Sequence, residues 1–74
     1  METLKLAGNV RALRRRQRMS RESLATKAGV SFSTVSRIEA GAHWPSARTV
    51  NALATALGST VADLLSDDLA EGAA

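Results

Sequence analysis

The stretch from Ser20 to Gly41 constrains the fold more than any other part of the chain; it reads SRESLATKAGVSFSTVSRIEAG. Ser20 and Ser31 each stand just before a short run of helix-forming residues, and serine is a favoured N-terminal cap of a helix. Gly29 and Gly41 each follow such a run, at the position where a left-handed backbone ends a helix. The pattern therefore predicts two short helices joined by a tight turn.

Helical patterns also lie on both sides of this pair. Residues 1–5 are expected to form an irregular lead-in. A helix is expected from about residue 6 or 7 to Arg18, because apolar residues recur there at i, i+4 and i+7. After the pair, Ser46 is expected to cap a fourth helix that Gly58 ends.

A short fifth helix is expected after Thr60, which is spaced to form a capping box with Asp63. No segment has the alternation of a strand, and none repeats another. The 74 residues are therefore expected to be all-α: a compact five-helix bundle over residues 1–66, then a flexible acidic tail over residues 67–74. The apolar residues expected on the inner helix faces are Leu6, Val10, Leu13, Leu24, Ala25, Ala28, Val35, Ile38, Val50, Leu53, Ala54, Leu57, Val61, Leu64 and Leu65.

The composition excludes several kinds of site. The absence of Cys rules out disulfides and thiolate metal sites, and the single His cannot hold a metal without several carboxylates. There is no Ser-His-Asp order, no pair of catalytic carboxylates and no phosphate-binding glycine loop, so neither an enzyme nor a bound cofactor is expected. No apolar run approaches transmembrane length and no signal-peptide core is present, so a cytoplasmic protein without membrane contact is expected.

Charge is distributed unevenly along the chain. Seven of the ten Lys and Arg residues lie in residues 1–21, whereas four of the seven Asp and Glu residues lie in residues 60–74. A basic end favours a polyanionic partner. The alternative is a solvated helix face followed by a solubilising tail.

Taken together, these segments resemble the helix-turn-helix domains of the lambdoid phage repressor and Cro type, the XRE family common in bacterial regulators. The resemblance covers about residues 6–66, and the spacing of caps, turn glycine and core residues agrees throughout. The matching segments are LR at 13–14, S-x-E-x-LA at 20–25, AGVS at 28–31, STVSRIEAG at 33–41, WPS at 44–46 and LATALG at 53–58.

The resemblance implies that the helix after Ser31 enters the major groove of double-stranded DNA. The positions that match the family's base readers are Phe32, Ser33 and Arg37, with Ser36 nearby. An arginine there can donate two hydrogen bonds to guanine, and an exposed Phe can pack on a thymine methyl group. The alternatives are a solvated Arg37 and a Phe32 that contacts another protein.

The resemblance also implies contacts with the phosphate backbone at the ends of the helices. The candidates are Ser20, Arg21, Ser31, His43, Trp44, Ser46 and Arg48. Arg14 matches the position that pairs with the Glu of the IE motif, which is Glu39 here. An Arg14–Glu39 ion pair is therefore expected to tie the first helix to the third, while the other arginines of the first helix supply general attraction to DNA.

The function expected from this reading is a sequence-specific transcription regulator, most simply a repressor, that binds an inverted-repeat operator as a homodimer. The region of the fourth and fifth helices is the expected dimer contact, with Leu64, Leu65 or Leu69 as candidates. One alternative is a protein-interaction module of the antitoxin or co-regulator type, with a protein partner. Another is the DNA-binding part of a larger regulator.

Overall fold

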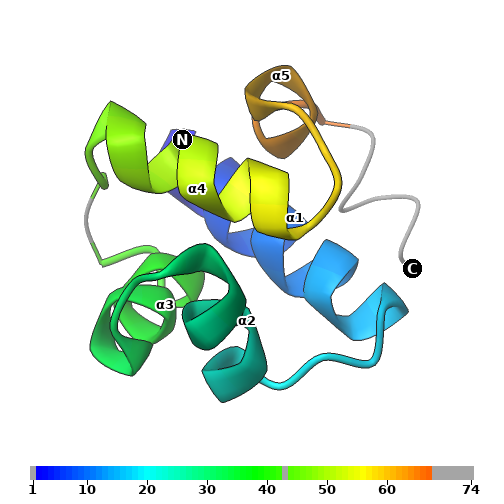
Figure 1. Ribbon diagram of the computed structural model, residues 1–74. Coiled ribbons are helices and arrows are strands. Elements are labelled where there is room, and N and C mark those ends of the chain that lie inside the picture. Colours follow the sequence, from blue (N-terminus) through cyan, green and yellow to red (C-terminus); the bar gives the residue numbers. More distant parts are fainter. Residues whose placement is uncertain (1, 43, 68–74) are drawn as a thin grey trace.

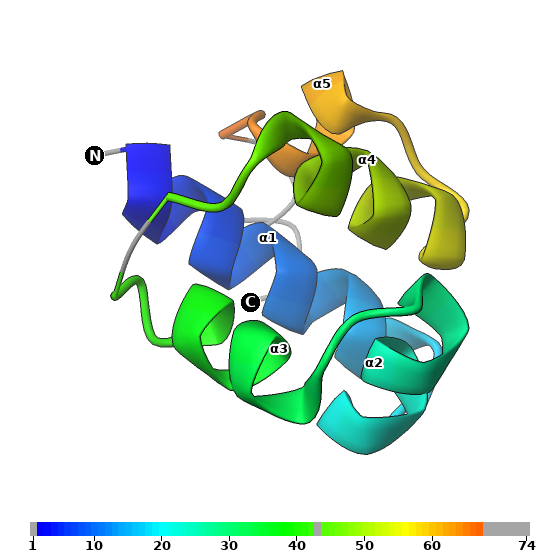
Figure 2. The ribbon, with the colours of Figure 1, turned by 60° about the vertical axis from the view of Figure 1, so that its left-hand side comes forward.

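The structure, a computed structural model, describes residues 2–42 and 44–67 and contains five helices and no strand in those ranges. The expected all-α class is confirmed. In Figures 1 and 2, α2 and α3 lie on one side of the molecule and α4 and α5 lie on the other. Helix α1 packs against α3 and α5, and α2 packs against α4. The helices are α1 (Glu2–Arg16), α2 (Arg21–Ala28), α3 (Phe32–Glu39), α4 (Ala47–Ala56) and α5 (Val61–Leu64).

Three of the helices end in the same way, with a glycine in the left-handed conformation. Gly29, Gly41 and Gly58 have φ of 74°, 70° and 68° after α2, α3 and α4. In each case the next N–H donates back to a carbonyl in the last turn, as Val30 does to Ala25 at 3.0 Å. These hydrogen bonds satisfy carbonyl groups that the end of a helix otherwise leaves without a partner.

The expected bounds of α1 were wrong at both ends. The helix starts at Glu2, so residues 2–5 are not an irregular lead-in. These residues carry neither Gly nor Pro to interrupt a helix. At the other end α1 stops at Arg16, because Arg18 has φ of 55° and the Met19 N–H donates to the Arg14 carbonyl at 3.0 Å. The chain therefore makes the turn that glycine makes elsewhere, with an arginine at the left-handed position.

The core lies between all five helices and contains the residues expected from the helical periods. Thirteen buried apolar residues form one cluster, and Ala28, Val61 and Leu65 pack against it partly buried. Leu64 is fully buried, so it is unavailable to a second chain, and its choice as a candidate dimer contact is wrong. Leu65 is half-buried, and Leu69 lies outside the described residues.

Asn9 is a buried polar residue inside the apolar face of α1, and its role was not anticipated. Its Nδ2 donates to the carbonyl oxygens of Leu64 and Ser66, both at 2.7 Å. These carbonyls lie at and beyond the end of α5, a helix of four residues that is too short to be stable alone. Asn9 therefore fastens the last helix to the first.

Replacing Asn9 with Leu is expected to lower the free energy of unfolding by about 1–2 kcal/mol, because two carbonyl groups lose a buried donor. The loss is at the lower end of the usual range because the Oδ1 of Asn9 meets no donor among the described residues. Urea denaturation measures the change. The control is Gln17→Ala. Gln17 is exposed, and its Nε2 donates to the Leu57 carbonyl at 2.7 Å, so the loss of this hydrogen bond should lower the free energy of unfolding by less. Equal losses would contradict the role given to Asn9.

The tail expected over residues 67–74 lies outside the described residues except for Asp67. The carboxylate of Asp67 is 2.9 Å from the Lys5 Nζ on the first turns of α1. Within the described part of the chain, no helix is long and apolar enough to cross a membrane. The same residues contain no group of His, Asp or Glu side chains that could hold a metal ion.

Candidate nucleic-acid interface

The turn between α2 and α3 is built from the features that the sequence displays. The Ser20 hydroxyl accepts from the Ser23 N–H at 3.0 Å and so starts α2. Gly29 ends that helix, and the Ser31 hydroxyl then accepts from the Thr34 N–H at 3.1 Å and starts α3. Each cap satisfies one free N–H of its helix. The direction of α3 relative to α2 follows from these three residues.

The outer face of α3 presents three of the four residues expected to read bases. Phe32, Ser33 and Arg37 are exposed, and 48% of the Phe32 surface is accessible. The inner face of the same helix buries Val35, Ile38 and Glu39. The helix therefore separates a buried side that holds the fold from a side open to a partner.

Phe32 has a neighbour that the sequence did not reveal. The guanidinium carbon of Arg21, at the start of α2, lies 5.8 Å from the centroid of the Phe32 ring. A cation at this distance over an aromatic face is attracted by the ring, weakly where both groups are exposed. The contact joins the first residue of α2 to the first residue of α3.

Ser36 is placed differently from the other three. It is half-buried and lines a pocket between α1, α2 and α3, together with four arginines. It therefore lies at the edge of the outer face of α3, next to α1.

The ion pair expected between Arg14 and Glu39 forms. Arg14 Nε lies 2.6 Å and Nη2 lies 3.0 Å from the two carboxylate oxygens of Glu39, and Nη1 donates to the Met19 carbonyl at 2.8 Å. Only 12% of the Arg14 side chain and 5% of the Glu39 side chain are exposed. Hydrogen bonding to Glu39 raises the pKa of Arg14 above its ordinary value, outweighing the opposite effect of burial.

Arg11 also binds Glu39, which the sequence did not indicate. Its Nη2 donates to the main-chain carbonyl of Glu39, and its Nε lies 3.9 Å from the Glu39 carboxylate. Glu39 is thus held by two arginines of α1. The only available signal was that Arg11 precedes Arg14 by three residues, so that the two share one side of the helix.

The residues expected to contact phosphates are mostly exposed, but several are already used in caps. Ser31 shares a hydrogen bond of 2.8 Å with the Thr34 hydroxyl, and Ser46 donates to the Thr49 hydroxyl at 3.1 Å while accepting from the Thr49 N–H. At these two positions the free backbone N–H groups of the helix are therefore better donors to a phosphate than the serine hydroxyls.

The other candidates for phosphate contact differ in their settings. Trp44 is 46% exposed in the segment before α4, and Ser20, Arg21 and Arg48 are exposed. His43 lies outside the described residues. Exposure leaves these side chains open to a partner.

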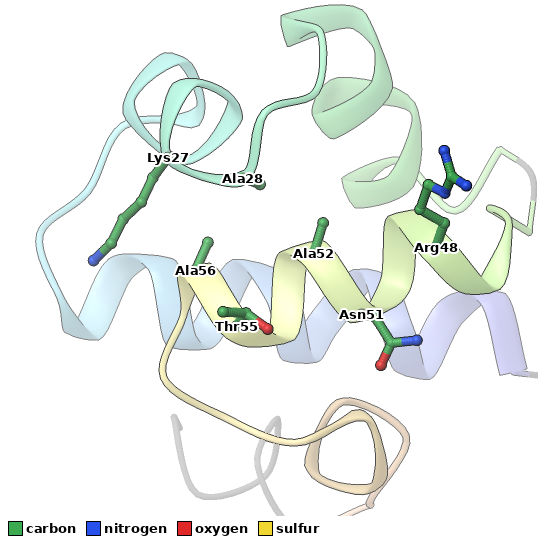
Figure 3. A pocket seen from close by; sticks show the side chains of 7 residues that line it. All are labelled: Lys27, Ala28, Arg48, Asn51, Ala52, Thr55 and Ala56. Carbon is green, nitrogen blue, oxygen red and sulfur yellow. The ribbon is translucent and has the colours of Figure 1, made fainter.

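A second hollow, of about 460 Å³, lies between α2 and α4. Figure 3 shows Ala52 and Ala56 pointing from α4 towards α2, where Ala28 faces them, with Lys27 and Arg48 at the two ends of the row. Small side chains allow two helices to approach closely. The hollow is thus the seam between α2 and α4, and it does not include the exposed face of α3.

The chain belongs to the helix-turn-helix family, because the model of the family described as "Helix-turn-helix" matches residues 10–64. Two solved structures share this fold. The restriction-modification controller protein C.AhdI from Aeromonas hydrophila is 32% identical with a TM-score of 0.80, and the match covers 84% of this chain and 94% of that chain. The clp gene regulator ClgR from Corynebacterium glutamicum is 28% identical with a TM-score of 0.83, and the match covers 97% of this chain and 74% of that chain.

A comparison with curated proteins gives no match. The family and the two regulators identify the chain as a DNA-binding transcription regulator and not an enzyme.

Proposed function

We propose that this protein binds a specific inverted-repeat operator as a homodimer, with α3 in the major groove, and that it acts as a repressor. The observation that carries the proposal is the exposed outer face of α3, where Phe32, Ser33 and Arg37 stand together on a helix whose other side is buried. Arg37 donates to the edge of guanine, Ser33 to a neighbouring base, and Phe32 packs on a thymine methyl group.

The size of α3 supports the dimer. Its eight residues span about 12 Å, which corresponds to about three or four base-pair steps of 3.4 Å. A site this short occurs too often in a genome to be specific. Two copies of the chain on half-sites about 34 Å apart double the number of bases read.

Backbone contacts hold the helix in the groove. Arg21 at the start of α2 and the free N–H groups at the starts of α2 and α4 face phosphates on either side of α3, with Trp44 and Arg48 beside the second of these. Among the residues expected from the sequence, Ser20, Ser31 and Ser46 contribute through the helix ends that they cap.

Selection of bound duplexes from a random pool tests the proposal. The expected result is enrichment of a palindrome with half-sites about one helical turn apart and a complex of two chains per duplex. The affinity for the enriched duplex should fall steeply as salt is added, since phosphate contacts release counterions. Failure to enrich any sequence, or a complex with one chain per duplex, would contradict the proposal.

One observation favours a second function, a protein-interaction module. Phe32 exposes an apolar ring at the edge of α3 that is suited to a protein partner. Replacing Phe32 with Ser distinguishes the two functions. Under the DNA proposal the variant changes the preferred base at one position of the enriched duplex. Under the alternative the enriched sequence is unchanged, and a protein that co-purifies with the wild-type chain is lost.

A further inference from the structure

A polar pocket of about 290 Å³ lies between α1, α2 and α3. It is lined by Arg11, Arg14, Arg15, Arg21, Ser36, Glu39 and Ala40, and we call it the arginine pocket. It adjoins the outer face of α3, because Ser36 and Ala40 lie on that helix or at its end. The four arginines lie on α1 and α2, and none lies on α3 itself. Helix α1 packs in the core, and α2 precedes the turn that leads into α3.

The charges in the arginine pocket do not cancel. Four guanidinium groups face one carboxylate, that of Glu39. Arg14 takes both oxygens of this carboxylate, and Arg11 approaches it from one side. The positive charges of Arg15 and Arg21 therefore remain uncompensated within the pocket.

Arg15 is the clearest case. It is exposed, and it forms no ion pair with any residue in the described ranges 2–42 and 44–67. Like charges held at one site repel each other, and an anion between them relieves this repulsion. Guanidinium groups also match the geometry of phosphate oxygens, to which they donate two parallel hydrogen bonds.

We propose that the arginine pocket binds a phosphate group, with Arg15 and Arg21 as its charged donors and the Ser36 hydroxyl as a neutral donor. The phosphate belongs to the DNA backbone next to the groove that α3 enters, so this inference rests on the proposed function. Arg11 and Arg14 hold Glu39 at the base of the pocket and fix the distance between α1 and α3. The first helix thus takes part directly in binding DNA instead of supplying only general attraction.

The test compares Arg15→Gln with Arg18→Gln. Both variants remove one charge from an exposed arginine near the end of α1, but only Arg15 lines the pocket. Binding is measured against salt on the duplex enriched by the wild-type protein and on a random duplex. Arg15→Gln should reduce the slope of log K against log salt by about one unit per chain on both duplexes. Its affinity should fall by about tenfold, and Arg18→Gln should stay near wild type in both measures.

Neutral methylphosphonate groups, placed one at a time along the enriched duplex, identify the phosphate. At one position the methylphosphonate should lower the affinity of the wild-type protein as much as the Arg15→Gln change does. At the same position it should not lower the affinity of the Arg15→Gln variant any further. Independent effects at every position, or equal losses from Arg15→Gln and Arg18→Gln, would overturn the assignment of a backbone phosphate to the pocket.

A free phosphate ion is the other source of the same chemistry, and titration of inorganic phosphate into the protein without DNA distinguishes it. A saturable shift of the arginine Nε–Hε resonances that disappears in Arg15→Gln, with DNA binding unchanged in that variant, would assign the pocket to the free ion and overturn the DNA source. No effect in either measurement would overturn the phosphate site itself. If the wild-type protein enriched no duplex, the proposed function would fail, and the phosphate titration would still decide whether the pocket binds phosphate.

Discussion

Replacing Arg37 with Ala is expected to remove most of the preference for the operator while leaving the fold intact. Arg37 is exposed in the last turn of α3 and forms no ion pair among the described residues, so its loss should change the stability by less than about 0.5 kcal/mol. A bidentate contact with guanine is worth about 1–3 kcal/mol of discrimination. In a homodimer both half-sites lose this contact.

The measurement is the ratio of affinities for the enriched duplex and a random duplex. Arg37→Ala should reduce this ratio by about 10- to 100-fold per half-site, with a smaller loss on random DNA. Arg18→Ala, which removes an arginine outside the outer face of α3, is the control and should leave the ratio unchanged. If both variants weakened both duplexes equally, Arg37 would act on phosphates or through net charge and would not read a base.

Much of the backbone was predictable because its signals are local. Ser20, Ser31 and Ser46 all cap the helices assigned to them, and Thr60 with Asp63 forms the expected capping box. A cap depends on a side chain and an N–H three residues later, and both can be read from the sequence. The glycines that end α2, α3 and α4 were predictable for the same reason.

The structure differs from the expectations from the sequence where segments distant in the chain meet. Arg18 takes a left-handed conformation that costs a non-glycine residue about 1–2 kcal/mol, and no local pattern predicts it. The hydrogen bond from Met19 to Arg14 supports this turn. Asn9 and Arg11 have partners 28 or more residues away, so only the packing of α1 on α3 and α5 reveals them.

The candidate site shows the same division between local and distant information. Helical phase placed Phe32, Ser33 and Arg37 on the exposed side of α3, as the structure has them. Ser36 has the same phase but faces arginines of α1 and α2. Periodicity assigns a residue to a side of its own helix, but it gives no information on which side chains a neighbouring helix places opposite.

The largest effect on stability is expected from Arg14→Met. The variant leaves the Glu39 carboxylate, which is 5% exposed, without the two hydrogen bonds that hold it. Removing one partner of a buried ion pair costs about 3–5 kcal/mol. We expect a loss near 3 kcal/mol, at the lower end of this range, because Arg11 lies close enough to shift towards the carboxylate. A domain of this size has about 4–11 kcal/mol in total, so urea denaturation should show the midpoint fall markedly.

A comparison with Asp67→Asn tests whether the burial of an ion pair, and not the distance between its charged atoms, determines the loss of stability. Asp67 pairs with Lys5 at 2.9 Å, close to the separation in the Arg14–Glu39 pair, but the two side chains are 69% and 40% exposed. Exposed pairs contribute about 0–1 kcal/mol, so this variant should change the stability little. Losses of similar size in the two variants would show that Arg14 contributes no more than a surface charge.

The double variant Arg14→Met/Glu39→Met tests why the single variant is destabilised. If the cost comes from a buried carboxylate without its partner, removing that carboxylate should restore part of the stability, so the double variant should be more stable than Arg14→Met alone. Recovery should be incomplete, because the Met19 carbonyl still lacks the donor that Arg14 supplies. If the stability losses of the two single variants added up in the double variant, Arg14 and Glu39 would contribute independent packing contacts and not a coupled bridge between α1 and α3. The coupling matters for DNA binding because Glu39 lies on the buried side of the helix whose other side carries Arg37.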